Sequence, residues 1–223
     1  MTQPLNKHIL QEILAHPNAP SLVKEANALL AAEQKRRQQF YEDITDEEKV
    51  EFINGEIIVH SPVMKEHNDA TNLLHRVISI FVGKNELGYV GIEKVMITLE
   101  RNDYEPDICF FGKAKAKHFK AGQSLFPAPD FIVEILSKGT KKNDRGIKFT
   151  DYEANGVAEY LLIDPKKEMV ELYRLDDKGK YELILKSSEG TLHSKVIRGF
   201  SIAIRAIFEE EKNLEELTRI LSV

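Results

Sequence analysis

Residues 131–164 read FIVEILSKGTKKNDRGIKFTDYEANGVAEYLLID and contain the stretch that decides the fold. Residues 131–136 form a compact run in which odd and even positions are both apolar, which is typical of a strand covered on both faces. Residues 160–163 predict a second buried strand. Residues 143–153 between them have helical character and end at Asn155-Gly156, a pair typical of a left-handed helix stop. The stretch therefore predicts strand, helix, strand.

The segment before this stretch predicts a hairpin, a helix and further strands. Asn54-Gly55 separates the β-prone residues 50–53 and 56–60, and this dipeptide is a strong signal for a tight hairpin. A helix should follow Ser61-Pro62, because its apolar residues recur on one helical face. These apolar residues are Leu73, Leu74, Val77, Ile78, Phe81 and Val82. Residues 89–93, 95–99 and 107–111 are strand-like, and residues 112–129 predict a loop.

The remaining elements complete the predicted architecture. Residues 170–175 and 181–185 alternate like a second hairpin, residues 192–207 add one or two strands, and residues 214–221 predict a terminal helix. Residues 1–43 predict two helices separated by a break at Pro17 and Pro20, which pack on the domain or on a partner chain. We therefore expect an α/β (α+β) fold, with a mixed β-sheet flanked by helices at residues 44–208. Residues 1–43 form an N-terminal helical extension and residues 209–223 a C-terminal helix.

Composition restricts the possible classes of protein. The chain has 223 residues, of which 42% are hydrophobic and 30% charged, and this balance favours a well-solvated protein with one large domain or one domain with an appendage. No apolar run reaches the roughly 18–20 residues of a membrane span, and the N-terminus lacks a secretory pattern. Cys109 is the single cysteine, which excludes an internal disulfide and favours the cytoplasm. The net charge of −5 means that nucleic acid would have to bind a local basic patch.

Glu134 is the least easily explained acid, since it interrupts the apolar run 131–136. Burying an ionised carboxylate costs on the order of several kcal/mol unless a cation pairs with it. Asp107 opens another predicted strand, where an acid is more often a turn residue. Two such acids together could chelate a divalent cation. Lys148 lies on the helix that follows Glu134 and shares one helical face with Asp144 and Tyr152, although an Asp144–Lys148 surface pair would explain that spacing equally well.

The first hairpin supplies two more acids. Glu51 and Glu56 lie on the same face of a hairpin with a two-residue turn, so the facing direction cannot separate them. Glu51 is further from the exposed turn and is the preferred candidate for an extra ligand or base. A solvated hairpin face is the alternative for both.

The ordered series of these segments resembles the Uma2 family. The resemblance rests on Pro106-Asp107, Glu134-Ile135-Leu136-Ser137, Lys148, Tyr152 and the run 159–165, with support from the hairpin 50–56, Ser61-Pro62, His67 and Gly199-Phe200. Uma2 proteins are a bacterial group described as endonucleases with the PD-(D/E)XK restriction-endonuclease-like fold. The resemblance covers about residues 44–208.

The resemblance implies a metal site and its chemistry. Asp107 and Glu134 match the family's metal ligands, Ile135 could add its backbone carbonyl, and the ion would be Mg²⁺ or Mn²⁺. The lysine of the parent motif would stand two residues after the second acid, where this chain has Leu136. Lys148 resembles a migrated replacement that would stabilise charge on the reacting phosphate. If Lys148 does not reach the site, hydrolysis is in doubt.

The resemblance also implies a substrate and supporting residues. We expect a metal-dependent endonuclease that hydrolyses DNA and acts as a homodimer; the alternative is a catalytically inactive module that binds nucleic acid or a protein partner. A basic segment next to the site could hold phosphates, or could be a solvated loop. Its cations are Lys138, Lys141, Lys142 and Arg145. His67 could contact the site or cap its helix, and Ser137 could bond a ligand carboxylate or end its strand.

Overall fold

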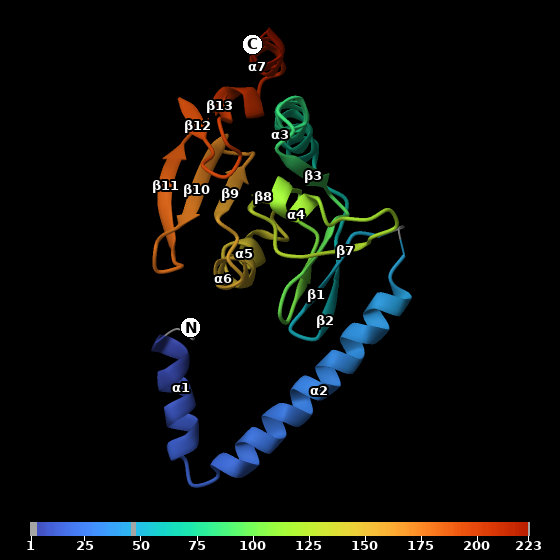
Figure 1. The fold of residues 1–223 in the computed structure, drawn as a ribbon, viewed down its shortest axis with the longest axis vertical. Coiled ribbons are helices and arrows are strands. Elements are labelled where there is room, and N and C mark those ends of the chain that lie inside the picture. Colours follow the sequence, from blue (N-terminus) through green and yellow to red (C-terminus); the bar gives the residue numbers. More distant parts are fainter. Residues whose placement is uncertain (1–3, 46–47, 223) are drawn as a thin grey trace.

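A two-helix arm leads into the folded domain. The computed structural model describes residues 4–45 and 48–222, beginning with α1 (Pro4–Ala15) and α2 (Ala19–Asp43). Figure 1 shows α2 extending diagonally from the domain, with α1 turning back at its far end. The two predicted N-terminal helices are present, and Pro20 lies in the first turn of α2, where its missing N–H has no helical partner to lose.

The C-terminal half of α2 is bound to the domain. Arg37 makes two hydrogen bonds to the buried carboxylate of Asp103, at 2.6 and 2.8 Å. Phe40 packs in a small core with Phe52, and Glu33 pairs with Arg101. The packed face of α2 therefore lies inside the segment that sequence analysis assigns to the N-terminal extension.

The domain contains two mixed sheets and a small ribbon. The first sheet has the order β2-β1-β5-β4-β7. Its strands are β1 (Val50–Ile53), β2 (Glu56–Val59), β4 (Met96–Thr98), β5 (Asp103–Tyr104) and β7 (Leu125–Phe126). Asn54 and Gly55 both have positive φ, as the predicted β1–β2 hairpin turn requires. The ribbon pairs β12 (Thr191–His193) with β13 (Ser201–Ala203).

The second sheet carries most of the core and has the order β11-β10-β9-β8-β6-β3. Its strands are β3 (Gly88–Ile92), β6 (Ile108–Gly112), β8 (Phe131–Ile135), β9 (Glu159–Asp164), β10 (Met169–Leu175) and β11 (Tyr181–Ser187). Every residue of β8 is buried, as two-sided coverage predicts. β8 and β9 are parallel, and the two short helices between them form the crossover. The mixed α+β class is therefore confirmed, although the strands divide between sheets.

Helices cover the second sheet. α3 (Lys65–Lys84) packs its apolar face into the main core together with the 3₁₀ turn Ile204–Ile207 and α7 (Glu210–Ser222). Figure 1 shows α3 beside the C-terminal segments, which are far from it in sequence. No helix among the described residues is long and apolar enough to span a membrane.

The predicted helix 143–153 is interrupted. The structure contains α5 (Lys141–Asp144) and α6 (Ile147–Ala154), separated by Arg145 and Gly146. A Cβ on Gly146 would lie 2.7 Å from the carbonyl oxygen of Lys142, so the close backbone approach at this break admits only glycine. The predicted loop 112–129 also contains a short helix, α4 (Lys113–Ala116), and the strand β7.

Candidate active site

Two neighbouring strands bring the predicted acids together. β6 and β8 are antiparallel, and Ile108 pairs with Val133, so the same register places Asp107 opposite Glu134. The backbone N–H of Ile135 donates to Oδ2 of Asp107 at 2.7 Å and fixes its carboxylate. Both acids are about 95% buried and line one cavity of about 620 Å³.

Lys148 reaches this pair from α6. Its Nζ lies 3.0 Å from Glu134 Oε1, 2.7 Å from Glu51 Oε1 and 3.5 Å from Asp144 Oδ1. The hydroxyl of Tyr152, one turn further along α6, donates to the same Glu134 oxygen at 2.9 Å. The lysine side chain is only 2% exposed, so its ammonium is surrounded by carboxylates rather than by water. The surface-pair explanation of Lys148 is therefore wrong.

The structure separates the two hairpin acids. Glu51 is fully buried and accepts the backbone N–H of Glu105 at 3.1 Å, whereas Glu56 is exposed beside the turn. Glu51 lies on β1, an interior strand between β2 and β5, and Glu56 lies on the edge strand β2. The edge strand β2 also lines the cavity, through Ile58 and Val59, so the distance from the turn, rather than the facing direction, brings Glu51 to the cavity.

Sequence analysis did not single out Lys49, His60 and Glu93, whose side chains line the cavity. Nζ of Lys49 lies 2.8 Å from Asp107 Oδ1 and 3.1 Å from Glu93 Oε2. Nε2 of His60 lies 3.1 Å from Glu51 Oε2. Lys49 stands two residues before Glu51, so strand alternation could have placed both on one face. No comparable sequence signal identifies Glu93, which follows β3 with a positive φ of 57°.

The electrostatics differ between the two central acids. Burial raises the pKa of Glu134 well above its usual range. Lys148 opposes this rise, and the neighbouring acids Asp144, Asp107 and Glu51 add to it. Burial would also raise the pKa of Asp107, but Lys49 and His67 outweigh it and hold that pKa below its usual range. Asp107 is therefore the more firmly ionised acid.

The predicted supporting residues have different surroundings. His67, in the first turn of α3, lies with Nε2 3.4 Å from Asp107 Oδ1. The Ser137 hydroxyl exchanges hydrogen bonds with Thr140, so it shapes the turn before α5 rather than bonding a site carboxylate.

All four cations of the predicted basic patch are exposed, but one of them pairs with an acid of the domain. Arg145 makes two hydrogen bonds to Glu171, at 2.7 and 3.0 Å, and is engaged in the domain. Lys138, Lys141 and Lys142 are exposed, and Lys138 lines the cavity. Three lysines therefore remain as candidates for contacts with phosphate groups.

The donor set fits a divalent cation. Carboxylate oxygens of Asp107, Glu134 and Glu51 border one cavity, and both ring nitrogens of His67 are buried without a hydrogen-bond partner in the described chain. Hard divalent ions prefer such oxygen ligands. At Ile135 the structure shows the N–H bonded to Asp107, and the role of its carbonyl as a ligand stays a prediction.

The comparisons with known proteins identify the family of the chain. The sequence model of the Uma2 family, described as "Putative restriction endonuclease", matches residues 37–205. The chain belongs to the Uma2 family. This match begins within α2, whose C-terminal half packs on the Uma2 domain, and it includes every residue of the cavity. The predicted resemblance is confirmed.

Relatives and a solved structure support the family assignment. An uncharacterized protein of Synechocystis is 30% identical over 155 residues, covering 69% of this chain and 84% of the relative. A second uncharacterized Synechocystis protein is 27% identical over 200 residues, covering 88% and 97%. A crystal structure from Anabaena variabilis, titled a putative nuclease belonging to DUF820, superposes with a TM-score of 0.66 at 20% identity, covering 77% of this chain and 96% of that one. This last likeness establishes the nuclease-like fold.

Proposed function

We propose that this Uma2 protein is a metal-dependent endonuclease that hydrolyses phosphodiester bonds in DNA. The observation that carries the proposal is the position of the Lys148 ammonium, 3.0 Å from Glu134 and beside Asp107 in one cavity. Two acids and a lysine are the groups that the nuclease motif requires, and here they meet although Leu136 occupies the usual lysine position. Leu136 is itself buried in the core, so that position has no access to a substrate.

The cavity residues have separate roles in the proposed reaction. Asp107 and Glu134, with Glu51 as a further acid, would hold Mg²⁺ or Mn²⁺. Such an ion polarises a phosphate and lowers the pKa of a bound water. Lys148 would place a positive charge where negative charge develops on the phosphate oxygens. Lys138, Lys141 and Lys142 would hold the flanking phosphates, which carry no sequence information.

Plasmid cleavage tests the proposal. Purified protein with Mg²⁺ or Mn²⁺ should nick or linearise supercoiled DNA, and EDTA should stop the reaction. Asp107→Asn, Glu134→Gln and Lys148→Met should each reduce cleavage by at least about 100-fold, in the range seen when a single stabilising group is removed. Lys117→Met, which changes a lysine outside the cavity lining, is the matched control. Cleavage retained by Glu134→Gln would contradict the proposed mechanism.

A catalytically inactive binding module is the second candidate, and one observation favours it. Lys148 and Lys49 already pair with the central carboxylates, so part of the acidic charge is balanced without a divalent ion. If the protein is such a binding module, it would bind DNA in the presence of EDTA, the Asp107→Asn variant would bind DNA as well, and no cleavage would occur. Replacing Lys138, Lys141 and Lys142 by alanine would abolish that binding.

We further propose that two copies associate through the N-terminal helices. The arm exposes many large apolar side chains, which a monomer would leave in water. They are Ile9, Leu10, Ile13, Leu14, Leu22, Val23, Leu29 and Leu30. Pairing of two copies would bury these side chains and would provide two active sites, one for each strand of a duplex.

A further inference from the structure

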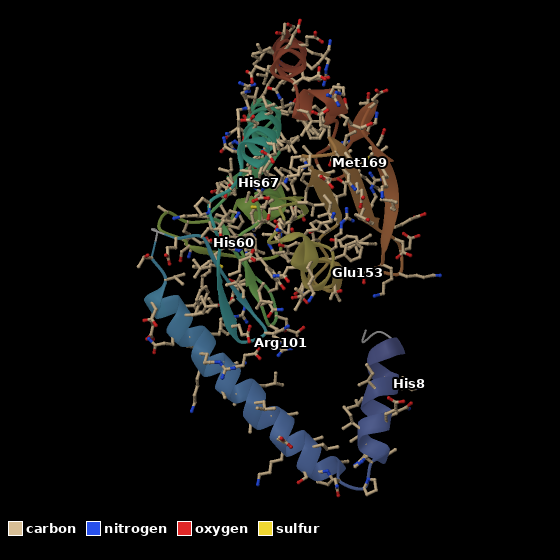
Figure 2. All side chains as sticks on the ribbon, turned by 180° about the vertical axis from the view of Figure 1, so that it is seen from behind. His8, His60, His67, Arg101, Glu153 and Met169 are labelled. Atoms are coloured by element: carbon tan, nitrogen blue, oxygen red, sulfur yellow. The ribbon has the colours of Figure 1, made fainter. Side chains whose placement is uncertain are left out.

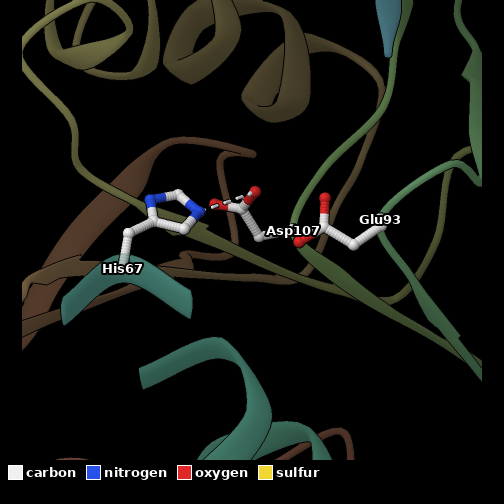
Figure 3. A group of neighbouring side chains, drawn as sticks. All are labelled: His67, Glu93 and Asp107. Atoms are coloured by element: carbon white, nitrogen blue, oxygen red, sulfur yellow. Dashed lines mark ion pairs between the residues drawn. The ribbon is translucent and has the colours of Figure 1, made fainter. Parts of the chain in front are cut away.

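A second group of possible ligands lies on the other side of Asp107. Ligand atoms of His67, Glu93 and Asp107 all lie within 4.8 Å of one another. Figure 3 shows the imidazole of His67 directed at the Asp107 carboxylate, with Glu93 on the opposite side of that carboxylate. The group combines one imidazole nitrogen with two carboxylate oxygens, whereas the Asp107–Glu134 pair offers oxygen alone.

The backbone holds these three residues in place. The N–H of Glu93 donates to the carbonyl of Asp107 at 3.0 Å, so the two acids are fixed as neighbours. His67 comes from the first turn of α3, and Asp107 is bound through its other oxygen to the N–H of Ile135. Oδ1 of Asp107 is consequently left facing His67 and the cavity.

His67 provides an independent indication of a ligand. The residue is 5% exposed, and neither ring nitrogen has a hydrogen-bond partner among residues 4–45 and 48–222. Apart from its ion contact with Asp107, the buried imidazole lacks a hydrogen bond, and such groups call for an explanation in a native fold. Its Nε2 lies 3.4 Å from Asp107 Oδ1, without hydrogen-bonding geometry. A cation between the imidazole and the carboxylates would satisfy this nitrogen.

Lys49 already places a cation at this position. Its ammonium contacts Asp107 Oδ1 and Glu93 Oε2, the same two carboxylates that complete the group. The lysine side chain is 16% exposed and can swing toward solvent on its flexible stem. The ammonium therefore marks a site of positive charge and competes with any ion that binds there.

We propose that His67, Glu93 and Asp107 form a binding site for a divalent transition-metal ion, which displaces the Lys49 ammonium. Imidazole nitrogen selects such ions over Mg²⁺ and Ca²⁺, which prefer all-oxygen ligands. The site shares Asp107 with the proposed catalytic pair but requires no nuclease activity. Metal binding at this site can therefore be measured independently of DNA cleavage.

Direct binding of Mn²⁺ to the metal-free full-length chain tests this site. Electron paramagnetic resonance measures the concentration of free Mn²⁺ in the presence of a large excess of Mg²⁺. The Mg²⁺ is added to saturate the oxygen ligands of the Asp107–Glu134 pair. We expect one Mn²⁺ ion per chain to stay bound in the presence of this Mg²⁺. The pulsed electron paramagnetic resonance spectrum of the bound ion should show coupling to an imidazole nitrogen. Absence of a Mg²⁺-resistant Mn²⁺ ion in the wild type would overturn the proposal, whether or not the protein cleaves DNA.

Matched variants identify the ligands. His67→Gln and Glu93→Gln should each lower the affinity for the Mg²⁺-resistant Mn²⁺ ion by at least about 10–100-fold. Removal of an outer-shell partner alone can cause a loss of this size. Glu134→Gln should retain this ion while abolishing cleavage, which separates the new site from the proposed catalytic pair. His75→Gln, which removes an imidazole bonded to Ser79 on the same helix, is the control and should change nothing. Unchanged affinity or nitrogen coupling in folded His67→Gln protein would overturn the assignment.

The Lys49→Met variant tests the displacement step. Without the competing ammonium, Mn²⁺ affinity should rise by about tenfold or more, equivalent to about 1.4 kcal/mol. Circular dichroism confirms that the variant is folded. Unchanged or weaker Mn²⁺ binding by folded Lys49→Met protein would contradict the competition between the lysine and the ion.

Discussion

Replacing Lys148 by methionine should destabilise the metal-free protein strongly, because the substitution leaves buried carboxylates without their shared cation. The Lys148 ammonium lies within 3.5 Å of Glu51, Glu134 and Asp144, and all four side chains are at most 5% exposed. Methionine keeps the length and apolar stem of the lysine, so the change is mainly the loss of charge. Removing one partner of a buried ion pair costs about 3–5 kcal/mol.

This magnitude can be measured in two ways. For a chain of this size each kcal/mol lowers the melting temperature by about 2–4 °C, so Lys148→Met should melt about 6–20 °C below the wild type. Urea unfolding in EDTA gives the free energy directly, and an unchanged slope would show that the unfolded state is unaffected. A loss of less than about 1 kcal/mol would refute the assignment of Lys148 as the buried counterion.

The double variant Lys148→Met/Glu134→Gln distinguishes charge balance from catalysis. Glutamine retains an acceptor for the Tyr152 hydroxyl but removes a carboxylate whose ionised form is disfavoured, since burial and nearby acids raise its pKa. Part of the lost stability should therefore return, as a coupling of about 0.5–3 kcal/mol between the two changes. Cleavage should stay absent, because the double variant lacks both a proposed metal ligand and the proposed phosphate-stabilising lysine. Additive destabilisation would show that the two residues are not energetically coupled.

Three further outcomes are expected away from the cavity. Arg37→Ala should lower the free energy of unfolding by about 3–5 kcal/mol, because the fully buried Asp103 loses its guanidinium partner. Arg36→Ala loses only an exposed hydrogen bond to a backbone carbonyl and should change the free energy of unfolding by less than about 0.5 kcal/mol. Urea unfolding measures both variants. Hydrogen bonds from Arg145, with help from Lys186 and Tyr173, lower the pKa of Glu171 to about 2, so this contribution to stability is present above pH 4.5 and is lost as the pH falls toward 2. Glu171→Gln should flatten the stability curve in that window, and parallel curves would contradict this. Deleting residues 1–30 removes the exposed apolar helices but keeps the packed part of α2, and light scattering should show a change from dimer to monomer; an unchanged mass would exclude these helices as the interface.

Local sequence signals predicted the strands and the class of fold. Asn54-Gly55 fixed the first hairpin because both positions need positive φ, and the apolar run around Glu134 revealed a strand covered on both faces. The break at Gly146 was missed, since it depends on a close approach to the Lys142 carbonyl that a helical pattern does not reveal. Strand β5 was missed because two residues are too few for a periodic signal.

Tertiary structure decided the parts of the site that sequence patterns left open. Glu51 and Glu56 share a predicted face, and the structure brings Glu51, the acid further from the turn, to the cavity. Lys49, His67 and Glu93 come from three separate segments, each of which has an ordinary structural explanation on its own. Their meeting at Asp107 depends on the packing of α3 and β3 beside β6, which composition and periodicity do not encode.

The replacement of the motif lysine by Leu136 follows from how β8 is covered. Residues 134 and 136 alternate onto the same side of the strand, so a lysine at 136 would share the face of Glu134. In this chain Leu136 packs in the core with Tyr152 and Tyr160, beneath α6. The same helix returns Lys148 to that face, with its ammonium on Glu134. In the proposed function Lys148 takes the role of the motif lysine. The carboxylate and the ammonium are neighbours because this lysine comes from the covering helix, while Leu136 on the strand packs in the core.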